Sequence, residues 1–209
     1  MRDIKKQWYL TGINGHLNTP EKVLEFLKEE TVGYKIITVG SSAGGFNAII
    51  TGQFLNAEKI FSFNGQFEIL SLLSKSSANV DPIVFRNQKN NRLLPYYDTL
   101  KFITNPKSIY YFHSNGSQWD IEQFDHAKNQ GVHKISFKTS NHGVPFLKTN
   151  LSYVINMTSA QLKELSGNTY QPLIFSIKTV GLSKTIKGLN SIVKFALNKI
   201  YISTLQRWK

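Results

Sequence analysis

The residues best suited to chemistry lie at positions 40–44, where the sequence GSSAG forms a G-x-S-x-G motif centred on Ser42. The β-branched run 34–39 (YKIITV) leads directly into it, and the apolar segment 46–55 follows with the character of a helix. A serine on a sharp turn between strand and helix is exposed and strained, as a nucleophile requires. The alternative is a glycine-rich turn that binds a phosphate or only turns the chain. We expect the nucleophile.

A serine hydroxyl reacts when a base removes its proton and a carboxylate orients that base. After a strand–turn–helix nucleophile the partners follow in the order Asp or Glu, then His. Here Ser42 is followed by Asp120 in the loop after a predicted strand, and by His142 just after the next one. Because the carboxyl ends of parallel strands share one edge of a sheet, we expect these side chains to meet there.

Three other carboxylates compete with Asp120, namely Asp98, Glu122 and Asp125. Asp125 is expected to point away from the strand end, about a turn and a half into the following helix. Asp120 itself could act only as an N-cap, because it falls where that helix begins. Asp120 remains the preferred partner of His142.

The other histidines have simpler interpretations. His113 closes a predicted strand, and His126 and His133 border a helix–strand turn, so we expect them to be structural or solvent-facing. His16 follows a glycine-rich loop and is a candidate substrate contact.

Short apolar strands alternate with helices along the chain, which predicts an α/β protein with a mostly parallel sheet of about five strands. The predicted strands cover 7–11, 34–39, Lys59–Phe63, 108–112 and 133–138, and the predicted helices cover Pro20–Glu30, 46–55 and 121–129. Residues 66–106 exceed what a crossover needs, so they predict a small cap or lid.

Four motifs together resemble the α/β-hydrolase superfamily over about residues 7–150. They are TGINGH (11–16), VGSSAGG (39–45), HSNGSQWD (113–120) and SNHG (140–143). The resemblance implies a reduced α/β-hydrolase fold with a catalytic domain over 1–156. It is reduced because only one helix separates the first two predicted strands, where the family has a helix, a strand and a helix.

The resemblance also implies roles for individual residues. Ser42 would be the nucleophile, His142 the general base and then the general acid, and Asp120 the orienting acid. The oxyanion hole would use the backbone N–H groups of Ala43 and Ile13. The candidate substrate contacts are Gly12, Ser41 and His16. No metal or organic cofactor is implied.

Charge is distributed unevenly over the 209 residues, which carry 25 Lys and Arg against 13 Asp and Glu. Residues 143–209 hold nine basic side chains and one acidic side chain. Lysine dominates arginine by 21 to 4, and neither an aromatic-basic RNA signature nor a zinc spacing is present, so we expect no nucleic-acid partner. The absence of cysteine excludes a disulfide scaffold and a thiolate metal site.

Residues 157–209 predict a basic helical C-terminal extension. Its apolar residues recur at spacings of three and four, which places them in one stripe. They are Leu182, Ile186, Leu189, Val193, Ala196 and Ile200. The stripe could pack on the body with its lysines solvated, or it could lie on an anionic membrane or meet an acidic partner.

These features predict a serine hydrolase that forms an acyl-enzyme, most simply a carboxylesterase or deacetylase acting on an acylated small molecule or sugar. The alternatives are an acyltransferase with the same three residues, and a non-catalytic scaffold that binds a membrane or partner through its tail. The WD-x-x-Q sequence at 119–123 before SNHG resembles small hydrolase-like proteins of bacterial surface-polysaccharide biosynthesis, which would imply an acylated sugar or glycan ester.

Location and assembly are less constrained. Residues 1–6 lack the apolar core of a secretory signal, and no run of about 18 apolar residues occurs. We therefore expect a cytoplasmic protein, with a tail that could place it at the inner face of the membrane. The oligomeric state stays open.

Overall fold

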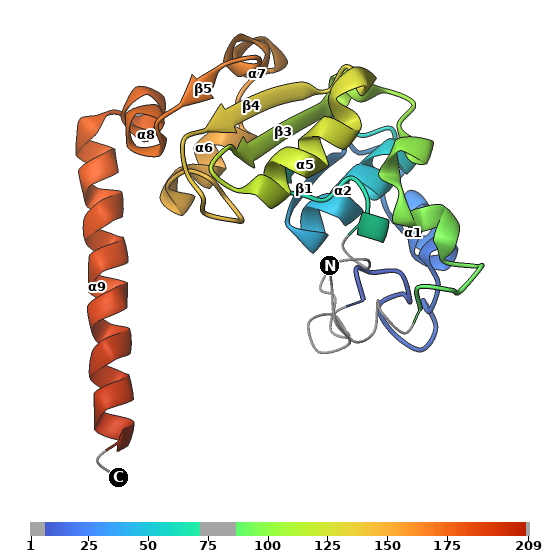
Figure 1. Cartoon of the computed structure of the whole chain (residues 1–209), viewed down its shortest axis with the longest axis horizontal. Helices are drawn as coiled ribbons and strands as arrows, with labels where there is room; N and C mark the ends of the chain where they lie inside the picture. The colour runs from blue at the N-terminus through green and yellow to red at the C-terminus, as the bar shows by residue number, and fades with distance from the viewer. Residues whose placement is uncertain (1–6, 72–86, 208–209) are drawn as a thin grey trace.

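The computed structural model describes residues 7–71 and 87–207, and it has a parallel sheet of five strands in the order β1-β2-β3-β4-β5 (Figure 1). Every neighbouring pair is parallel. The strands are β1 (Ile37–Ser41), β2 (Lys59–Phe63), β3 (Ile109–Ser114), β4 (His133–Phe137) and β5 (Thr169–Tyr170). The α/β class and parallel sheet predicted from the sequence are confirmed.

Helices cover both faces of this sheet. The α-helices are α1 (Pro20–Glu30), α2 (Ala43–Phe54), α5 (Gln118–Ala127), α6 (Leu151–Ile155), α7 (Ser159–Leu165), α8 (Pro172–Val180) and α9 (Leu182–Arg207). The 3₁₀ turns are η1 (Leu94–Tyr97), η2 (Thr99–Phe102), η3 (Pro106–Ser108), η4 (Lys128–Gln130) and η5 (Lys148–Asn150). The prediction for α1 is confirmed to the residue, because Thr19 caps it and Pro20 opens it.

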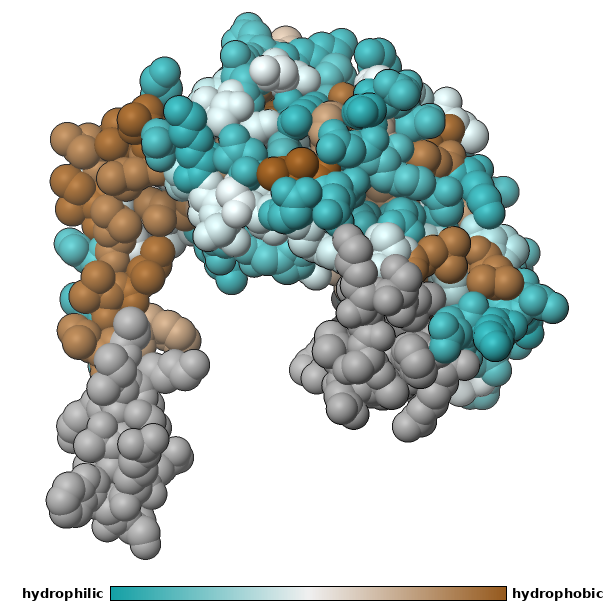
Figure 2. Space-filling model, viewed as in Figure 1, coloured by the Kyte–Doolittle hydropathy of each residue, from teal (hydrophilic) through white to brown (hydrophobic). Residues whose placement is uncertain are grey.

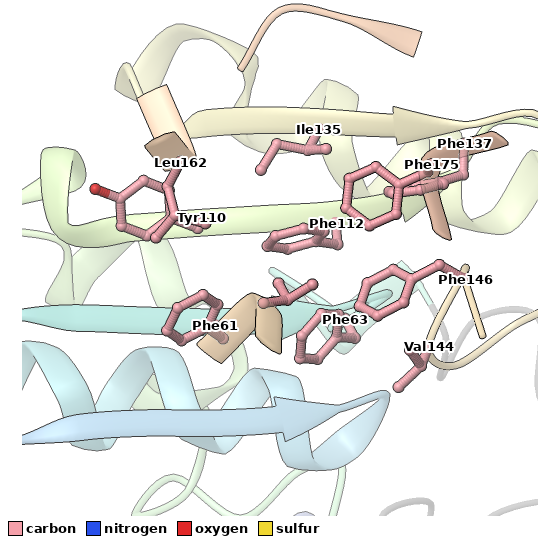
Figure 3. Packing of buried hydrophobic residues seen from close by; sticks show 11 residues of the cluster. Phe61, Phe63, Tyr110, Phe112, Ile135, Phe137, Val144, Phe146, Leu162 and Phe175 are labelled. Carbon is pink, nitrogen blue, oxygen red and sulfur yellow. The ribbon is translucent and has the colours of Figure 1, made fainter. Parts of the chain in front are cut away.

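Alternate residues of the central strands build the two halves of the core. Tyr110 and Phe112 of β3 face the side covered by α6, α7 and α8, whereas Ile109 and Tyr111 face the side covered by α2 and α5. Figure 3 shows the first side, where aromatic rings from three adjacent strands pack together. Each buried phenylalanine there stabilises the fold by about 1.5–3 kcal/mol relative to an exposed one.

The first predicted strand, over residues 7–11, is wrong. Trp8 and Tyr9 have φ values of 58° and 63°, which no strand can contain, and the segment forms successive turns. Trp8 and Leu10 are nevertheless buried, and Trp8 packs edge-on against Phe46 of α2 at 5.6 Å between ring centroids. Without a strand beside it, β1 forms one edge of the sheet.

The insertion predicted as a cap over 66–106 is partly integrated into the body. Ile69, Leu93 and Tyr97 are buried in a cluster with Trp8 and Phe46. Residues 72–86 lie outside the described residues. The buried residues of the described insertion therefore pack as core beside α2, whereas residues 89–92 are exposed.

The boundary predicted at residue 157 does not coincide with a change in packing. Leu162 of α7 and Phe175 of α8 belong to the main core, and β5 extends the sheet beside β4. The sequence did not predict β5, because two residues are too short to show a strand pattern. Among the described helices and strands, only α9 extends away from the body (Figure 1).

Most of the described part of the predicted apolar stripe of α9 is not packed on the body. Leu182 is 59 % exposed and Val193 is 55 % exposed, whereas Leu189 is half-buried, and the side chains of Ala196 and Ile200 lie outside the described residues. Among the described positions of the helix, Thr185 and Gly188 are buried. The described part of the chain contains no helix that is both long and apolar enough to cross a membrane.

Candidate functional site

The turn between β1 and α2 has the backbone that the motif predicts. Ser42 lies at φ 55° and ψ −126°, between the last residue of β1 and the first residue of α2. Its N–H donates to the Phe63 carbonyl at the end of β2, 3.0 Å away. A non-glycine residue at positive φ costs about 1–3 kcal/mol, so the surrounding structure must hold this turn in place.

Two glycines make that turn possible: Gly40, the first glycine of the motif, and Gly45, which follows the motif. A Cβ at Gly40 would overlap the Gly44 carbonyl, whereas a Cβ at Gly44 would meet nothing within 4 Å. At Gly45 a Cβ would lie 2.6 Å from Gly65 Cα and 2.8 Å from Ser62 Oγ. Close approach therefore requires glycine at 40 and 45, and Gly45 lets α2 pack against the turn that follows β2.

Ser42, His142 and Asp120 form one hydrogen-bonded chain, although they are separated by up to 100 residues in sequence. His142 Nε2 lies 2.8 Å from Ser42 Oγ, and His142 Nδ1 lies 2.9 Å from Asp120 Oδ1. An ionised carboxylate only accepts hydrogen bonds, so Nδ1 carries the ring proton and Nε2 accepts from the serine hydroxyl. This is the arrangement in which an imidazole can take a proton from serine.

Burial differs sharply along this chain. The Asp120 side chain is 1 % exposed, whereas that of His142 is 40 % exposed. The buried carboxylate therefore bonds the imidazole from the protein interior, and the rest of the imidazole is partly open to solvent. Ser117, rather than Asp120, caps α5, since Ser117 Oγ accepts from the Asp120 N–H at 3.3 Å. The alternative in which Asp120 serves only as the N-cap of this helix is therefore wrong.

The competing acids have other partners. Asp98 Oδ1 lies 3.2 Å from His126 Nε2, and Glu122 Oε1 accepts from the Gln118 side chain at 3.3 Å. Among the described residues, Asp120 is the carboxylate bonded to His142.

A residue that sequence reasoning missed, Asn64, holds the loop around His142. It is fully buried, and its Nδ2 donates to the carbonyls of Asn141 at 3.2 Å and Gly143 at 2.9 Å. Its Oδ1 accepts from the Ser114 N–H at 2.7 Å. Asn64 thus braces both neighbours of His142 from the end of β2. Its sequence signal, an Asn-Gly pair after a strand, is indistinguishable from an ordinary turn.

The chain after His142 is anchored in the main core. Val144 and Phe146 are buried beside Phe63 and Phe112, and the Phe146 ring lies 5.7 Å from that of Phe63 between centroids (Figure 3). The histidine therefore sits on a short loop tied down on one side by hydrogen bonds and on the other by aromatic packing.

One expected oxyanion donor is placed well and the other is not. Ala43 is the first residue of α2, where an N–H has no acceptor within its own helix. The Ile13 N–H instead donates to the Leu17 carbonyl at 2.8 Å. The prediction for Ile13 is therefore wrong in this structure, because its proton is already used to close the 12–17 loop.

The candidate substrate contacts occupy different environments. Gly12 is buried at φ 78°, and a Cβ there would overlap the Leu17 carbonyl. Glycine at this position therefore allows the 12–17 loop to close. His16 is exposed, and its backbone N–H donates to the Asn14 side chain. Ser41 faces a groove of about 530 Å³ along the open edge of β1, together with Tyr9 and Gly44. Because Tyr9 lines the same groove, the segment around residue 9 lies close to the turn that carries Ser42.

The structural roles expected for His113 and His133 are confirmed. His113 is buried, with Nε2 2.9 Å from Ser136 Oγ and its ring in contact with the rings of Tyr111 and Phe124. Burial, with a further contribution from Lys134, lowers the pKa of His113 to about 4, so the ring is neutral. His133 stacks on Tyr110 at 5.0 Å, and burial lowers its pKa as well.

The described residues contain no group of three or more His, Asp or Glu side chains that could hold a metal ion. Comparison of the chain with protein-family models, curated proteins and solved structures finds no match in any of the three.

Proposed function

We propose that the protein is a serine hydrolase that forms an acyl-enzyme, acting as an esterase or deacetylase on an acylated small molecule or sugar. The observation that carries this proposal is the chain of hydrogen bonds from Ser42 through His142 to Asp120, at 2.8 and 2.9 Å. The strained backbone at Ser42 supports it further, because strain of this size persists where the structure needs a side chain held outward.

In the proposed reaction Ser42 Oγ attacks the ester carbonyl while its proton passes to His142 Nε2. The oxyanion receives the Ala43 N–H, and Asp120 stabilises the imidazolium that forms. When the intermediate collapses, the alcohol leaves with the proton from His142. Water then attacks the acyl-enzyme by the same route and releases the carboxylic acid.

A fluorophosphonate probe tests the proposal without knowledge of the substrate. The wild-type protein should be labelled at Ser42, and Ser42→Ala should abolish labelling. His142→Ala should slow it by at least about a hundredfold, because general-base assistance is lost.

Two matched controls separate the site from the rest of the surface. Ser152→Ala removes an exposed serine of α6, and His126→Ala removes the other histidine that pairs with an aspartate. Both variants should be labelled like wild type. Labelling that survives Ser42→Ala would refute the nucleophile, and an unlabelled wild-type protein would favour a non-catalytic scaffold.

Hydrolysis and acyl transfer share the acyl-enzyme and differ only in what attacks it. Incubation with aryl acetates and an excess of sugar, followed by product analysis, distinguishes them. Free acetate supports the hydrolase, and an acetylated sugar formed in its place would support the transferase.

A further inference from the structure

The longest helix of the chain leaves a stripe of apolar side chains uncovered. Leu182, Ile186, Val193 and Leu197 of α9 are all exposed, from 47 % at Ile186 to 59 % at Leu182 and Leu197. At 3.6 residues per turn these positions fall within an arc of about 60° on one side of the helix. Figure 2 shows apolar surface gathered over α8 and the adjoining part of α9.

This stripe is not the surface by which α9 contacts the body. The described body contacts of α9 include Thr185 and Gly188, which are buried, and Lys184, whose Nζ lies 4.9 Å from the ring centroid of Tyr153 in α6. A Cβ at Gly188 would lie 2.5 Å from Thr149 Oγ1, so the helix approaches closely on that side. The apolar stripe lies on a different side of the helix from Thr185 and Gly188. The contact with the body therefore leaves the stripe exposed.

The charge of the helix narrows the kind of partner. The sequence of α9 contains five basic residues and no acidic one, and the last acidic residue of the chain is Glu164. Lys187 and Lys194 are exposed, on a side of the helix away from the stripe. A second copy of α9 would bring only like charges to these lysines, which disfavours self-association through this surface.

We propose that α9 docks on an anionic lipid bilayer, lying along its surface. The docking surface comprises Leu182, Ile186, Val193 and Leu197, which enter the acyl boundary, and Lys187 and Lys194, which reach the phosphate groups. The apolar stripe with lysines beside it suits a helix that lies in the interface, whereas the exposed Ile192 and Phe195 line the groove that faces the body. No described helix is apolar enough to cross the bilayer instead.

A groove of about 530 Å³ lies between α9 and the loop around His142, with Ile192 and Phe195 on one wall and Asn141 and Val144 on the other. These two apolar residues of α9 face the body, on the opposite side of the helix from the stripe. The docking proposal itself does not depend on catalysis.

Cosedimentation of the full chain with vesicles tests the proposal. We expect the protein to bind vesicles of phosphatidylcholine mixed with phosphatidylglycerol and to bind pure phosphatidylcholine far more weakly. Raising the salt from 0.1 M to 1 M should weaken binding, because the Debye length falls from about 10 Å to about 3 Å.

Two pairs of substitutions separate the apolar and electrostatic contributions. Lys187→Gln with Lys194→Gln should lower the partition coefficient about 25-fold, at about fivefold for each lysine. Ile186→Asn with Val193→Asn should lower the partition coefficient about a hundredfold, because two apolar side chains no longer enter the acyl boundary of the bilayer.

A matched control uses two exposed apolar residues far from α9 in sequence. Val32→Asn with Tyr34→Asn changes side chains that are 76 % and 75 % exposed, and it should bind like wild type, as should Ser42→Ala. Equal binding to neutral vesicles, no binding to anionic ones, or an equal loss in the control would overturn the proposal. Light scattering tests the alternative of a second copy. A wild-type dimer that does not bind vesicles and that becomes monomeric only in the α9 variants would assign the surface to a second copy.

Discussion

At the scale of single residues, the imidazole of His142 is positioned from several directions. Asp120 bonds its Nδ1, Asn64 bonds the carbonyls on either side of it, and Phe146 anchors the chain a few residues later. A displacement of about 1 Å at a reacting group can cost about a hundredfold in rate. The loop supports should therefore matter nearly as much as the reacting groups.

Asn64→Asp tests this support. The aspartate keeps an acceptor for the Ser114 N–H but replaces the amide that donates to Asn141 and Gly143 with an oxygen that repels their carbonyls. We expect the second-order rate of fluorophosphonate labelling to fall about a hundredfold. Circular dichroism should show a folded protein, and an unchanged labelling rate would contradict the positioning role.

Asp120→Asn tests the orienting acid. The amide can donate to Nδ1, which favours the wrong ring tautomer, and a loss of about 10⁴ in rate is the expected size of the effect. The rate of labelling measures it. Asp98→Asn, which alters the second Asp–His pair of the molecule, is the matched control and should react at the wild-type rate.

The buried His113 predicts a pH dependence of stability. Its folded-state pKa is about 4, below the ordinary value of 6.5, so as the pH falls the unfolded chain binds the proton first. Its contribution to stability is complete above about pH 6.5 and is lost progressively toward pH 4, by up to about 3 kcal/mol. Urea unfolding at several pH values should show that His113→Phe loses less stability than wild type between about pH 6.5 and pH 4. Equal losses of stability in the two proteins would show that His113 is not their cause.

At the scale of elements, the approach of α2 to the turn after β2 decides where Ser42 lies. A Cβ at position 45 would press on the backbone of Gly65, whereas a Cβ at the adjacent position 44 meets open space. The same substitution at two neighbouring positions therefore separates packing from helix propensity.

Gly45→Ala should destabilise the protein by about 1–3 kcal/mol, which is the usual cost of overpacking. Gly44→Ala should leave stability unchanged or raise it by up to about 1 kcal/mol, because alanine favours the helix. Thermal and urea unfolding measure both. Similar destabilisation by the two variants would mean that the close approach is not what requires glycine.

Helices and strands could be predicted from the sequence where the residues that stabilise them are close together in the chain. The helix α1 follows from Thr19, Pro20 and the apolar spacing, all within eleven residues. The segment 7–11 has a strand-like composition, but burial of Trp8 against Phe46 is achieved by turns instead. No pattern within five residues records that distant contact.

At the scale of the whole molecule, α9 is the least integrated element. The described core clusters contain no residue of α9, and the helix contacts the body through a few positions that include Thr185, Gly188 and Lys184. The uneven charge seen in the sequence is therefore carried largely by a helix outside the core.

Removal of residues 182–209 should leave the catalytic body folded. We expect the 1–181 chain to label with fluorophosphonate at a rate close to wild type and to lose its affinity for anionic vesicles. Labelling kinetics and cosedimentation test the two halves of this expectation separately. A truncated chain that fails to fold would show that α9 contributes more to stability than its contacts indicate.

Features that depend on neighbouring residues can be predicted from the sequence: the α/β class, the helix at Pro20–Glu30, the turn at Ser42, and the order Ser42, Asp120, His142. Sterics and hydrophobic periodicity act over a few residues, so a short stretch of sequence contains their signal. Three other features emerged with the folded structure: Asn64 braces His142, the Ile13 N–H is engaged, and most of the stripe of α9 is uncovered. Those features arise from groups far apart in the chain, and packing alone determines which of them meet.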